Sequence, residues 1–308
     1  MAVRQPSAGC ARAGGGGCCA AFTPPVEIAD ELATRAAALA LVLPPDVAAA
    51  GRTALWLLGL DVLGPCLEVT VPRGRHLRHR AGLAVFSAAL PDQEVVLVGS
   101  LRAVSAARAF VDVARHESVV EAVALGDEVL RSGAATLEQL QSAVVRAKGL
   151  RGLRKAEAVV PHLEPRSESP MESRLRMRLV LGGVARAQAQ WDVYTEDGHV
   201  GRGDLYLAGV VLEYDGRKER LEEKVFVAER RRQTALAETG LELRRFTARD
   251  VYVRPAAAIC AEVVRAVAMA ATRDRSRLRA GRDTLRPPRL RPLPTLAEIQ
   301  AVAAGHAA

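Results

Sequence analysis

The sequence contains no run of about 18 uncharged apolar residues, the length that a membrane-spanning helix needs, although 49% of its 308 residues are hydrophobic. Residues 1–22 also lack the apolar core of a secretory signal peptide. With 25% charged residues, the composition is typical of a soluble globular protein. We therefore expect a cytoplasmic protein without a membrane partner.

Cysteine is scarce, and its arrangement excludes two kinds of stabilisation. The five cysteines are Cys10, Cys18, Cys19, Cys66 and Cys260. Their number is odd, three of them stand in a Gly/Ala-rich leader, and no CxxC pair is accompanied by a second pair of ligands. The sequence predicts neither a disulfide framework nor a structural zinc site.

Aromatic residues make up only 4% of the chain, and none interrupts the basic stretch PRGRHLRHR at residues 72–80. A surface that stacks on bases usually alternates aromatic and basic side chains. Residues 72–80 are therefore either a solvent-exposed loop or a patch that contacts nucleic acid through charge alone. His76 and His79 have no third ligand nearby, so no metal site is predicted there.

What the chain has in excess is positive charge, with a formal net charge of +8 and a pI of about 9.7. Such a balance is compatible with a polyanionic partner. Part of it is local, because residues 271–308 contain eight Arg against Asp274, Asp283 and Glu298. The stretch RPPRLRPLP predicts a flexible tail there, either solvated or in contact with phosphates.

The pattern of elements predicts two domains between a disordered leader at 1–25 and the tail at 271–308. Residues 26–160 indicate a small α+β unit followed by helices, and the proline-rich segment 160–170 separates it from a second domain at 168–270. In the first domain we expect helices at 28–42 and 48–60, strands at 67–71, 83–87 and 94–98, and helices from 105 to 160. Capping boxes at Ser118/Glu121 and Thr136/Gln139 predict two helix starts.

The second domain predicts the element order α-β-β-β-α-β-α, which places the protein in the α/β (α+β) class. The expected elements are a helix at 171–183, strands at 187–195, 200–207 and 210–216, a helix at 222–239, a strand at 241–246 and a helix at 255–271.

Acidic residues interrupt the hairpin GDLYLAGVVLEYDG at 203–216. A two-residue loop at Ala208–Gly209 would place Asp204 directly across from Glu213, and Asp215 would share the face of Glu213. Opposed like charges are destabilising, and a divalent cation such as Mg²⁺ would relieve the conflict. The alternative is a wet edge hairpin whose acids only discourage edge pairing.

Glu172 and the arginine cluster at 230–232 each allow two interpretations. Glu172 stands in the first turn of a helix, where the helix dipole favours an acid, and from there it could also point at the hairpin. Arg230, Arg231 and Arg232 belong to a mixed-charge helix that is typical of a solvated face, or they supply an arginine that faces a phosphate.

The stretches SESPMESRLR, GDLYLAGVVLEYDG and ERRRQTALAETGLELRRF resemble the very-short-patch-repair-like (Vsr-like) endonuclease domain. That domain is a branch of the PD-(D/E)XK restriction-endonuclease-like superfamily, and the likeness covers residues 168–270. It implies an α-β-β-β-α-β core and Mg²⁺- or Mn²⁺-dependent hydrolysis of DNA, in repair or defence.

Carried over by position, the resemblance implies a set of site residues. Asp204 matches the metal-binding aspartate, Glu213 the second acid, Asp215 the motif residue of EYDG and Glu172 the helix acid. The basic positions and an additional backbone ligand complete the set: Lys218, Arg232 and Arg245 would face DNA, and the Tyr214 carbonyl would join Asp204 and Glu213 at the metal.

Two positions depart from that family. Glu219 stands where relatives usually have a histidine, and Gly203 where they commonly have valine or isoleucine.

The N-terminal half resembles the C-terminal part of AbiEi-type antitoxins through RTALWLLGLDVL, LEVTVPRG and LRAVSAARAFVDVARH. The alternative function is therefore a catalytically impaired, DNA-binding regulator of the antitoxin type, with a toxin partner or a homodimer left open.

Overall fold

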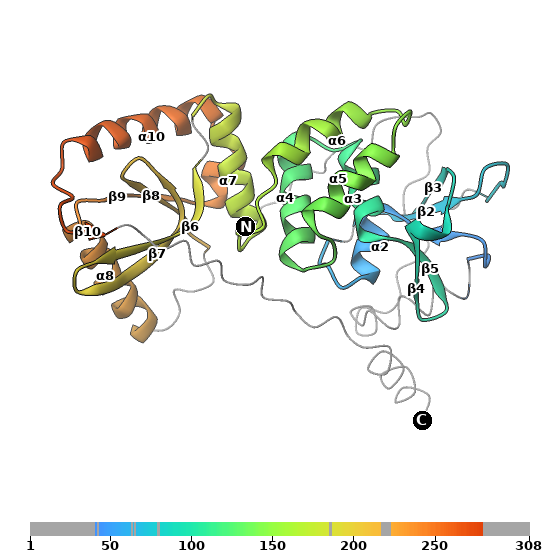
Figure 1. The fold of residues 1–308 in the computed structure, drawn as a ribbon, viewed down its shortest axis with the longest axis horizontal. Coiled ribbons are helices and arrows are strands. Elements are labelled where there is room, and N and C mark those ends of the chain that lie inside the picture. The colour runs from blue at the N-terminus through green and yellow to red at the C-terminus, as the bar shows by residue number, and fades with distance from the viewer. Residues whose placement is uncertain are drawn as a thin grey trace, which may run out of the picture.

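The computed structural model describes residues 41, 43–62, 64, 66–78, 81–184, 187–216 and 223–279, with side chains described from residue 230 onward in the last segment. These residues form two lobes side by side (Figure 1). The predicted leader at 1–25 and nearly all of the predicted helix at 28–42 lie outside the described residues. No helix within the described ranges is both long enough and apolar enough to span a membrane.

The N-terminal lobe contains a five-stranded mixed sheet in the order β3-β2-β1-β5-β4. Its strands are β1 (Ala48–Ala49), β2 (Leu67–Val71), β3 (Leu83–Ser87), β4 (Val95–Val98) and β5 (Leu101–Val104). The predicted strands at 67–71 and 83–87 are confirmed, and β4 begins one residue late because Asp92–Glu94 forms a 3-10 turn. β1 has only two residues, too few to show a period of two, and it lies in the stretch predicted as a helix at 48–60, of which only Gly51–Leu57 is helical. β5 was not predicted either.

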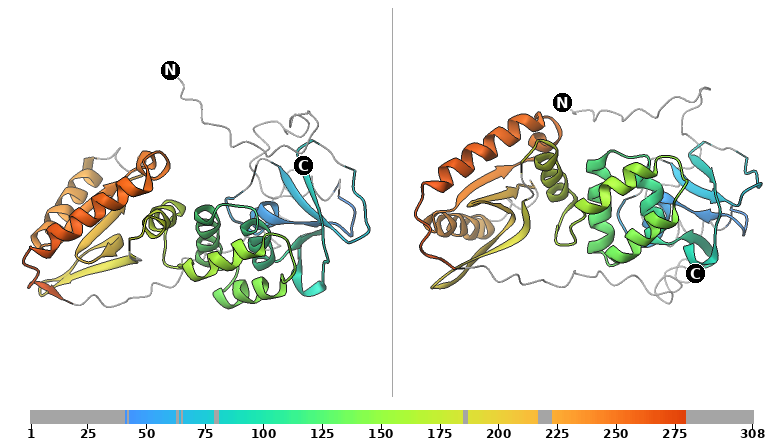
Figure 2. Two further views of the ribbon diagram at one scale, coloured as in Figure 1. Left: turned by 90° about the horizontal axis from the view of Figure 1, so that it is seen from above. Right: turned by 45° about the horizontal axis from the view of Figure 1, so that its top comes forward.

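Helices cover the side of this sheet that faces the other lobe (Figure 2). They are α2 (Gly51–Leu57), α3 (Ala106–Ala114), α4 (Val119–Arg131), α5 (Leu137–Arg146) and α6 (Leu153–Val159). The Thr136/Gln139 capping box at α5 is confirmed. The Ser118/Glu121 box is only half formed: Ser118 caps the helix, but the Glu121 carboxylate binds Arg174 at 2.7 Å instead.

The C-terminal lobe has the predicted α-β-β-β-α-β-α order, with a short extra helix and a final extra strand. The elements are α7 (Pro170–Leu181), β6 (Gln188–Thr195), β7 (Gly198–Leu207), β8 (Val210–Tyr214), α8 (Glu223–Glu238), β9 (Glu242–Phe246), α9 (Ala248–Tyr252), α10 (Ala256–Ala271) and β10 (Leu278–Arg279). The mixed α and β content confirms the predicted fold class. β10 pairs with β6, so residues 278–279 of the predicted tail at 271–308 form a strand of the sheet.

The C-terminal sheet runs in the order β10-β6-β7-β8-β9, with β8 and β9 parallel and the neighbouring pairs of β6, β7 and β8 antiparallel. Helices α7 and α10 cover one face and enclose a core that includes Leu175, Leu205 and Leu212. On the other face Val211 packs against Leu236 of α8. Because β8 lies between β7 and β9 and is covered on both sides, its one acid, Glu213, is only 7% exposed.

Helix α7 belongs to the cores of both lobes. Met177 packs into the N-terminal core, whereas Leu175 and Leu179 pack into the C-terminal one. Between these apolar positions Arg176 is fully buried and binds Asp127 of α4 at 2.7 Å. The boundary between the domains at 26–160 and 168–270 stays a prediction, and α7 is the element that joins them.

The Arg176–Asp127 pair yields a stability prediction. Replacing Arg176 with Met leaves the Asp127 carboxylate buried without its cation, which costs about 3–5 kcal/mol for a buried pair. The matched control is Arg174→Met on the same helix, because the Arg174–Glu121 pair is partly exposed and its loss should cost about 1 kcal/mol or less. Urea unfolding of the two variants at pH 8 measures the difference. Equal losses of free energy would contradict a structural role for the buried pair.

Candidate functional site

The hairpin of β7 and β8 forms as the sequence predicts. Ala208 and Gly209 both have positive φ, 48° and 92°, which is the geometry of a two-residue turn. The predicted pairs Leu207–Val210, Tyr206–Val211 and Leu205–Leu212 are confirmed.

Beyond Leu205 the two strands separate, and the predicted pairing of Asp204 with Glu213 is wrong. The ladder ends at Leu205–Leu212, and the backbone N–H of Tyr214 donates a 2.8 Å hydrogen bond to the Asp204 carboxylate instead of to a backbone carbonyl. The Asp204 side chain therefore occupies the gap between β7 and β8. The hairpin rule fails here because it assumes a ladder that continues without interruption.

Gly203, the position before this aspartate, has a steric reason to lack a side chain. A Cβ atom there would lie 2.3 Å from Cγ1 of Val211, which is far inside van der Waals contact. Val211 is fully buried against α8 and cannot move aside. Packing against Val211 therefore accounts for glycine at position 203, where the family that this domain resembles commonly has valine or isoleucine.

Glu172 approaches Asp204 from the first turn of α7. Ser169 caps that helix by accepting the Glu172 N–H at 3.2 Å. The Oε2 atom of Glu172 accepts one hydrogen bond from the backbone N–H of Glu168 and one from Nε2 of Gln190, both at 2.9 Å. Glu172 is 6% exposed, so α7 and β6 hold this acid beneath the surface.

Gln190 is a site residue that sequence reasoning missed. It lies in β6 between the pairs Ala189–Leu205 and Trp191–Gly203, and therefore opposite Asp204. Its φ of 54° interrupts the regular alternation of the strand and turns the amide toward Glu172. A positive φ at glutamine leaves no signal in the sequence.

The acids around Asp204 perturb each other. Burial, followed by the negative charges of Glu172 and Glu213, raises the pKa of Asp204 from 3.8 to about 7, against the opposing effects of the Tyr214 N–H and Arg232. Burial also raises the pKa of Glu172. Asp204 and Glu172 form a pair of acids that repel each other in a poorly solvated place.

Glu213 has a different environment, because two arginines neutralise it. Its Oε1 accepts from Nη2 of Arg232 in α8 at 2.7 Å, and its Oε2 accepts from Nη2 of Arg245 in β9 at 3.1 Å. Arg245 stands beside Glu213 in the parallel ladder of β8 and β9. The two predicted basic positions therefore lie at the site, and they compensate Glu213 without a metal ion.

The other residues predicted for the site are Asp215, Lys218 and the Tyr214 carbonyl. Asp215 follows the end of β8, is half-buried, and donates its backbone N–H to the carbonyl of Phe246 at 2.8 Å. Lys218 and Glu219 lie outside the described residues. The roles assigned to Asp215, Lys218 and the Tyr214 carbonyl stay predictions.

Comparison with known proteins finds two relatives of unknown activity. They are the uncharacterised Mycobacterium tuberculosis proteins MT2308, from strain CDC 1551 / Oshkosh, and Rv2248, from strain ATCC 25618 / H37Rv. Each is 27% identical to this chain over 175 residues. The match covers 57% of this chain and 64% of each relative, so the chain spans less than two thirds of their length. No family model and no solved structure matches the chain.

Two of the acids fit a divalent cation. The repulsion between the Asp204 and Glu172 carboxylates is only partly offset by the Tyr214 N–H and Arg232, and Oε1 of Glu172 has no hydrogen bond among the described contacts. Mg²⁺ commonly binds one or two carboxylates and completes its shell with water and phosphate oxygens. Within the described ranges, no three His, Cys, Asp or Glu side chains form a group that could hold a metal ion.

The raised pKa of Asp204 yields a pH-dependent prediction. Between about pH 4 and 7 the folded state binds this proton more tightly than the unfolded chain does, so the free energy of unfolding should fall as pH rises through that window. Asp204→Asn keeps an oxygen for the Tyr214 N–H and removes the repulsion. We expect this variant to be more stable than wild type by roughly 2–4 kcal/mol at pH 8 and nearly equal at pH 4.

Urea unfolding at pH 4, 6 and 8 measures this effect, with Asp192→Asn as the matched control. Asp192 lies on the neighbouring strand and pairs with Arg202 at 3.3 Å and with His199 at 2.9 Å. Because Asp192 pairs with the positively charged Arg202, its substitution should lower stability at pH 8. An Asp204→Asn variant that is less stable than wild type at pH 8 would contradict the charge conflict.

Proposed function

We propose that this protein is a metal-dependent DNA endonuclease of the Vsr-like type that hydrolyses phosphodiester bonds. The observation that carries the proposal is the charge conflict at Asp204, a carboxylate whose pKa is raised to about 7 by burial first and then by the nearby charges of Glu172 and Glu213. An acid in such an environment is a candidate for a functional site. The α7-β6-β7-β8-α8-β9 order, which agrees with the resemblance, supports it.

In this proposal Asp204 and Glu172 hold a Mg²⁺ or Mn²⁺ ion, and Gln190 orients Glu172 through its 2.9 Å hydrogen bond. When bound, the ion would polarise the phosphate and lower the pKa of a bound water. The oxygen of water forms a bond to phosphorus while a bridging P–O bond breaks, and the leaving oxygen takes up a proton.

Arg232 and Arg245 are the groups that would face the phosphate. Both side chains are about three-tenths exposed, at 27% and 30%, so part of each reaches the surface while it holds Glu213. A guanidinium group binds phosphate oxygens as readily as it binds a carboxylate. These arginines would offset the negative charge that develops on the phosphate.

A second function rests on the same ion pairs. Both oxygens of Glu213 are already engaged by arginines, which leaves the predicted second metal ligand occupied. With Glu219 in place of the family histidine, this favours the catalytically impaired, DNA-binding regulator of the AbiEi antitoxin type. That protein would bind DNA in a salt-sensitive manner and cleave nothing.

A nicking assay on supercoiled plasmid with Mg²⁺ or Mn²⁺ separates the two functions. Asp204→Ala should slow cleavage by at least about 100-fold, because loss of groups that only support a metal ligand already costs 10- to 100-fold. The matched control is Asp197→Asn, an acid of the same sheet whose side chain is 73% exposed in the β6–β7 turn. Wild-type protein that binds plasmid but leaves it uncut with either metal would favour the regulator.

A further inference from the structure

The turn between α5 and α6 carries a surface that the proposed nuclease site does not use. Five cations occur within ten residues, all of them exposed: Arg146, Lys148, Arg151, Arg154 and Lys155. No acidic residue interrupts the segment 146–155. We call these five side chains the basic turn.

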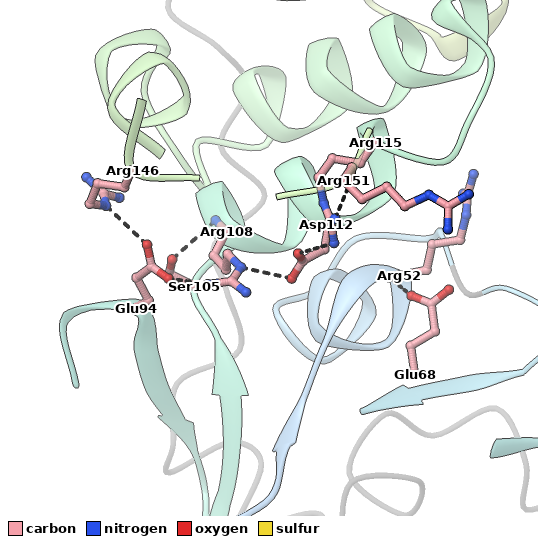
Figure 3. Close-up of polar contacts among 9 residues, drawn as sticks. All are labelled: Arg52, Glu68, Glu94, Ser105, Arg108, Asp112, Arg115, Arg146 and Arg151. Carbon is pink, nitrogen blue, oxygen red and sulfur yellow. Dashed lines mark hydrogen bonds and ion pairs between the residues drawn. The ribbon is translucent and has the colours of Figure 1, made fainter. Parts of the chain in front are cut away.

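The backbone of the basic turn is held in one conformation. Arg115, the residue that directly follows α3, donates from Nη1 to the carbonyl of Arg151 at 2.7 Å (Figure 3). Gly152 has a φ of 82°, and a Cβ there would lie 2.6 Å from the carbonyl oxygen of Arg115. Leu150 and Leu153 pack against the N-terminal core. The side chains of the basic turn therefore project from a backbone that these contacts hold in place.

The acidic residues next to the basic turn already have positively charged partners. Glu94 is only 4% exposed and binds Arg108 and Arg146, and Asp112 binds Arg108 and Arg115 (Figure 3). Three arginines thus satisfy two acids, and the network has no negative charge left to offer the surface above it.

The outer cations of the basic turn have no such partner. Lys155 donates from Nζ to the backbone carbonyls of His116 and Glu117 at 3.4 and 3.5 Å, and neither carbonyl carries a charge. Lys148, Arg151 and Arg154 form no ion pair with any acid in the part of the chain that the structure describes.

Helix stability does not explain the placement of these cations. Positive side chains are favourable in the last turn of a helix and unfavourable in the first. Arg146 and Lys148 are at or just beyond the end of α5, where they stabilise it, but Arg154 and Lys155 stand in the first turn of α6. The carbonyls just after the end of α3 compensate Lys155 for this position, whereas no described contact compensates Arg154, and an anionic partner would offset its cost.

We propose that the basic turn is a contact surface for the sugar-phosphate backbone of double-stranded DNA. The phosphates of a duplex place about one negative charge every 1.7 Å along its axis, a density that matches closely spaced cations on a rigid turn. The segment contains no aromatic residue that would stack on unpaired bases, which favours a duplex over a single strand. Contacts to phosphates carry no sequence information, so we expect binding that is independent of sequence. This inference goes beyond the nuclease proposal, because it requires no chemistry at Asp204.

Fluorescence anisotropy of the full-length protein with a labelled 30-base-pair duplex, in EDTA and over a series of salt concentrations, tests the inference. The variant is Arg151→Gln with Arg154→Gln. Loss of two phosphate contacts should weaken binding by about 10- to 100-fold near 100 mM salt and reduce the slope of log K against log salt by roughly 2.

The matched control is Arg249→Gln with Arg265→Gln, which removes the same charge from exposed arginines of the C-terminal lobe that have no ion pair within the described residues. The control should leave the slope unchanged. An unaltered slope in the Arg151/Arg154 variant, or equal loss in both variants, would overturn the inference. So would a wild-type protein that binds polyglutamate but no duplex, since the partner would then be an acidic protein.

The EDTA condition keeps the two proposals separate. Cleavage is absent from this assay, so a protein that never nicks plasmid would refute the endonuclease and leave the basic turn standing. Equally, an active nuclease whose binding ignores Arg151 and Arg154 would refute only the basic turn.

Discussion

The buried ion pair between Arg176 and Asp127 fixes how the two lobes relate. A fully buried guanidinium group is costly unless its charge is paired, and here the carbonyl of His162 and the Asp127 carboxylate accept hydrogen bonds from Nη1 and Nη2, each at 2.7 Å, while Nε is buried without a partner among the described residues. Burial raises the pKa of Asp127 to about 6 even though Arg176 opposes the shift, so the carboxylate would be still less favourable without the arginine. The pair therefore adds a directional, charge-assisted contact to the apolar packing that joins α7 to the N-terminal core.

The same helix carries Glu172 into the candidate site. One end of α7 is capped by Ser169 beside β6, and its middle is clamped by Arg176, so the position of Glu172 relative to Asp204 follows from contacts in both lobes. The site is thus built from the interface as well as from the C-terminal sheet. This arrangement explains why a charge conflict at Asp204 can persist: the surrounding packing is strong enough to hold acids where their solvation is poor.

The regular parts of the fold were predictable from the sequence, and the irregular parts of the site were not. Alternating apolar residues and the Ala208–Gly209 turn located β7 and β8 and three of their pairs correctly. The separation of the strands at Asp204 and the positive φ of Gln190 depend on packing between elements distant in sequence, so no local pattern reports them. The acids and arginines of the site could be named from their spacing, but whether an acid would meet a metal, an arginine or another acid could not.

Glu213 shows how the arginines change the chemistry open to this site. With both oxygens engaged by Arg232 and Arg245, Glu213 has its charge balanced, while Asp204 and Glu172 are left as the acids without a cationic hydrogen-bond partner among the described contacts. A phosphate that approached would compete with Glu213 for the same guanidinium groups, since carboxylate and phosphate accept the same paired N–H bonds. Any arginine drawn toward phosphate would leave Glu213 less neutralised and so increase the negative charge next to Asp204. The electrostatic balance of this site therefore favours a phosphate and a cation binding together over either of them binding alone.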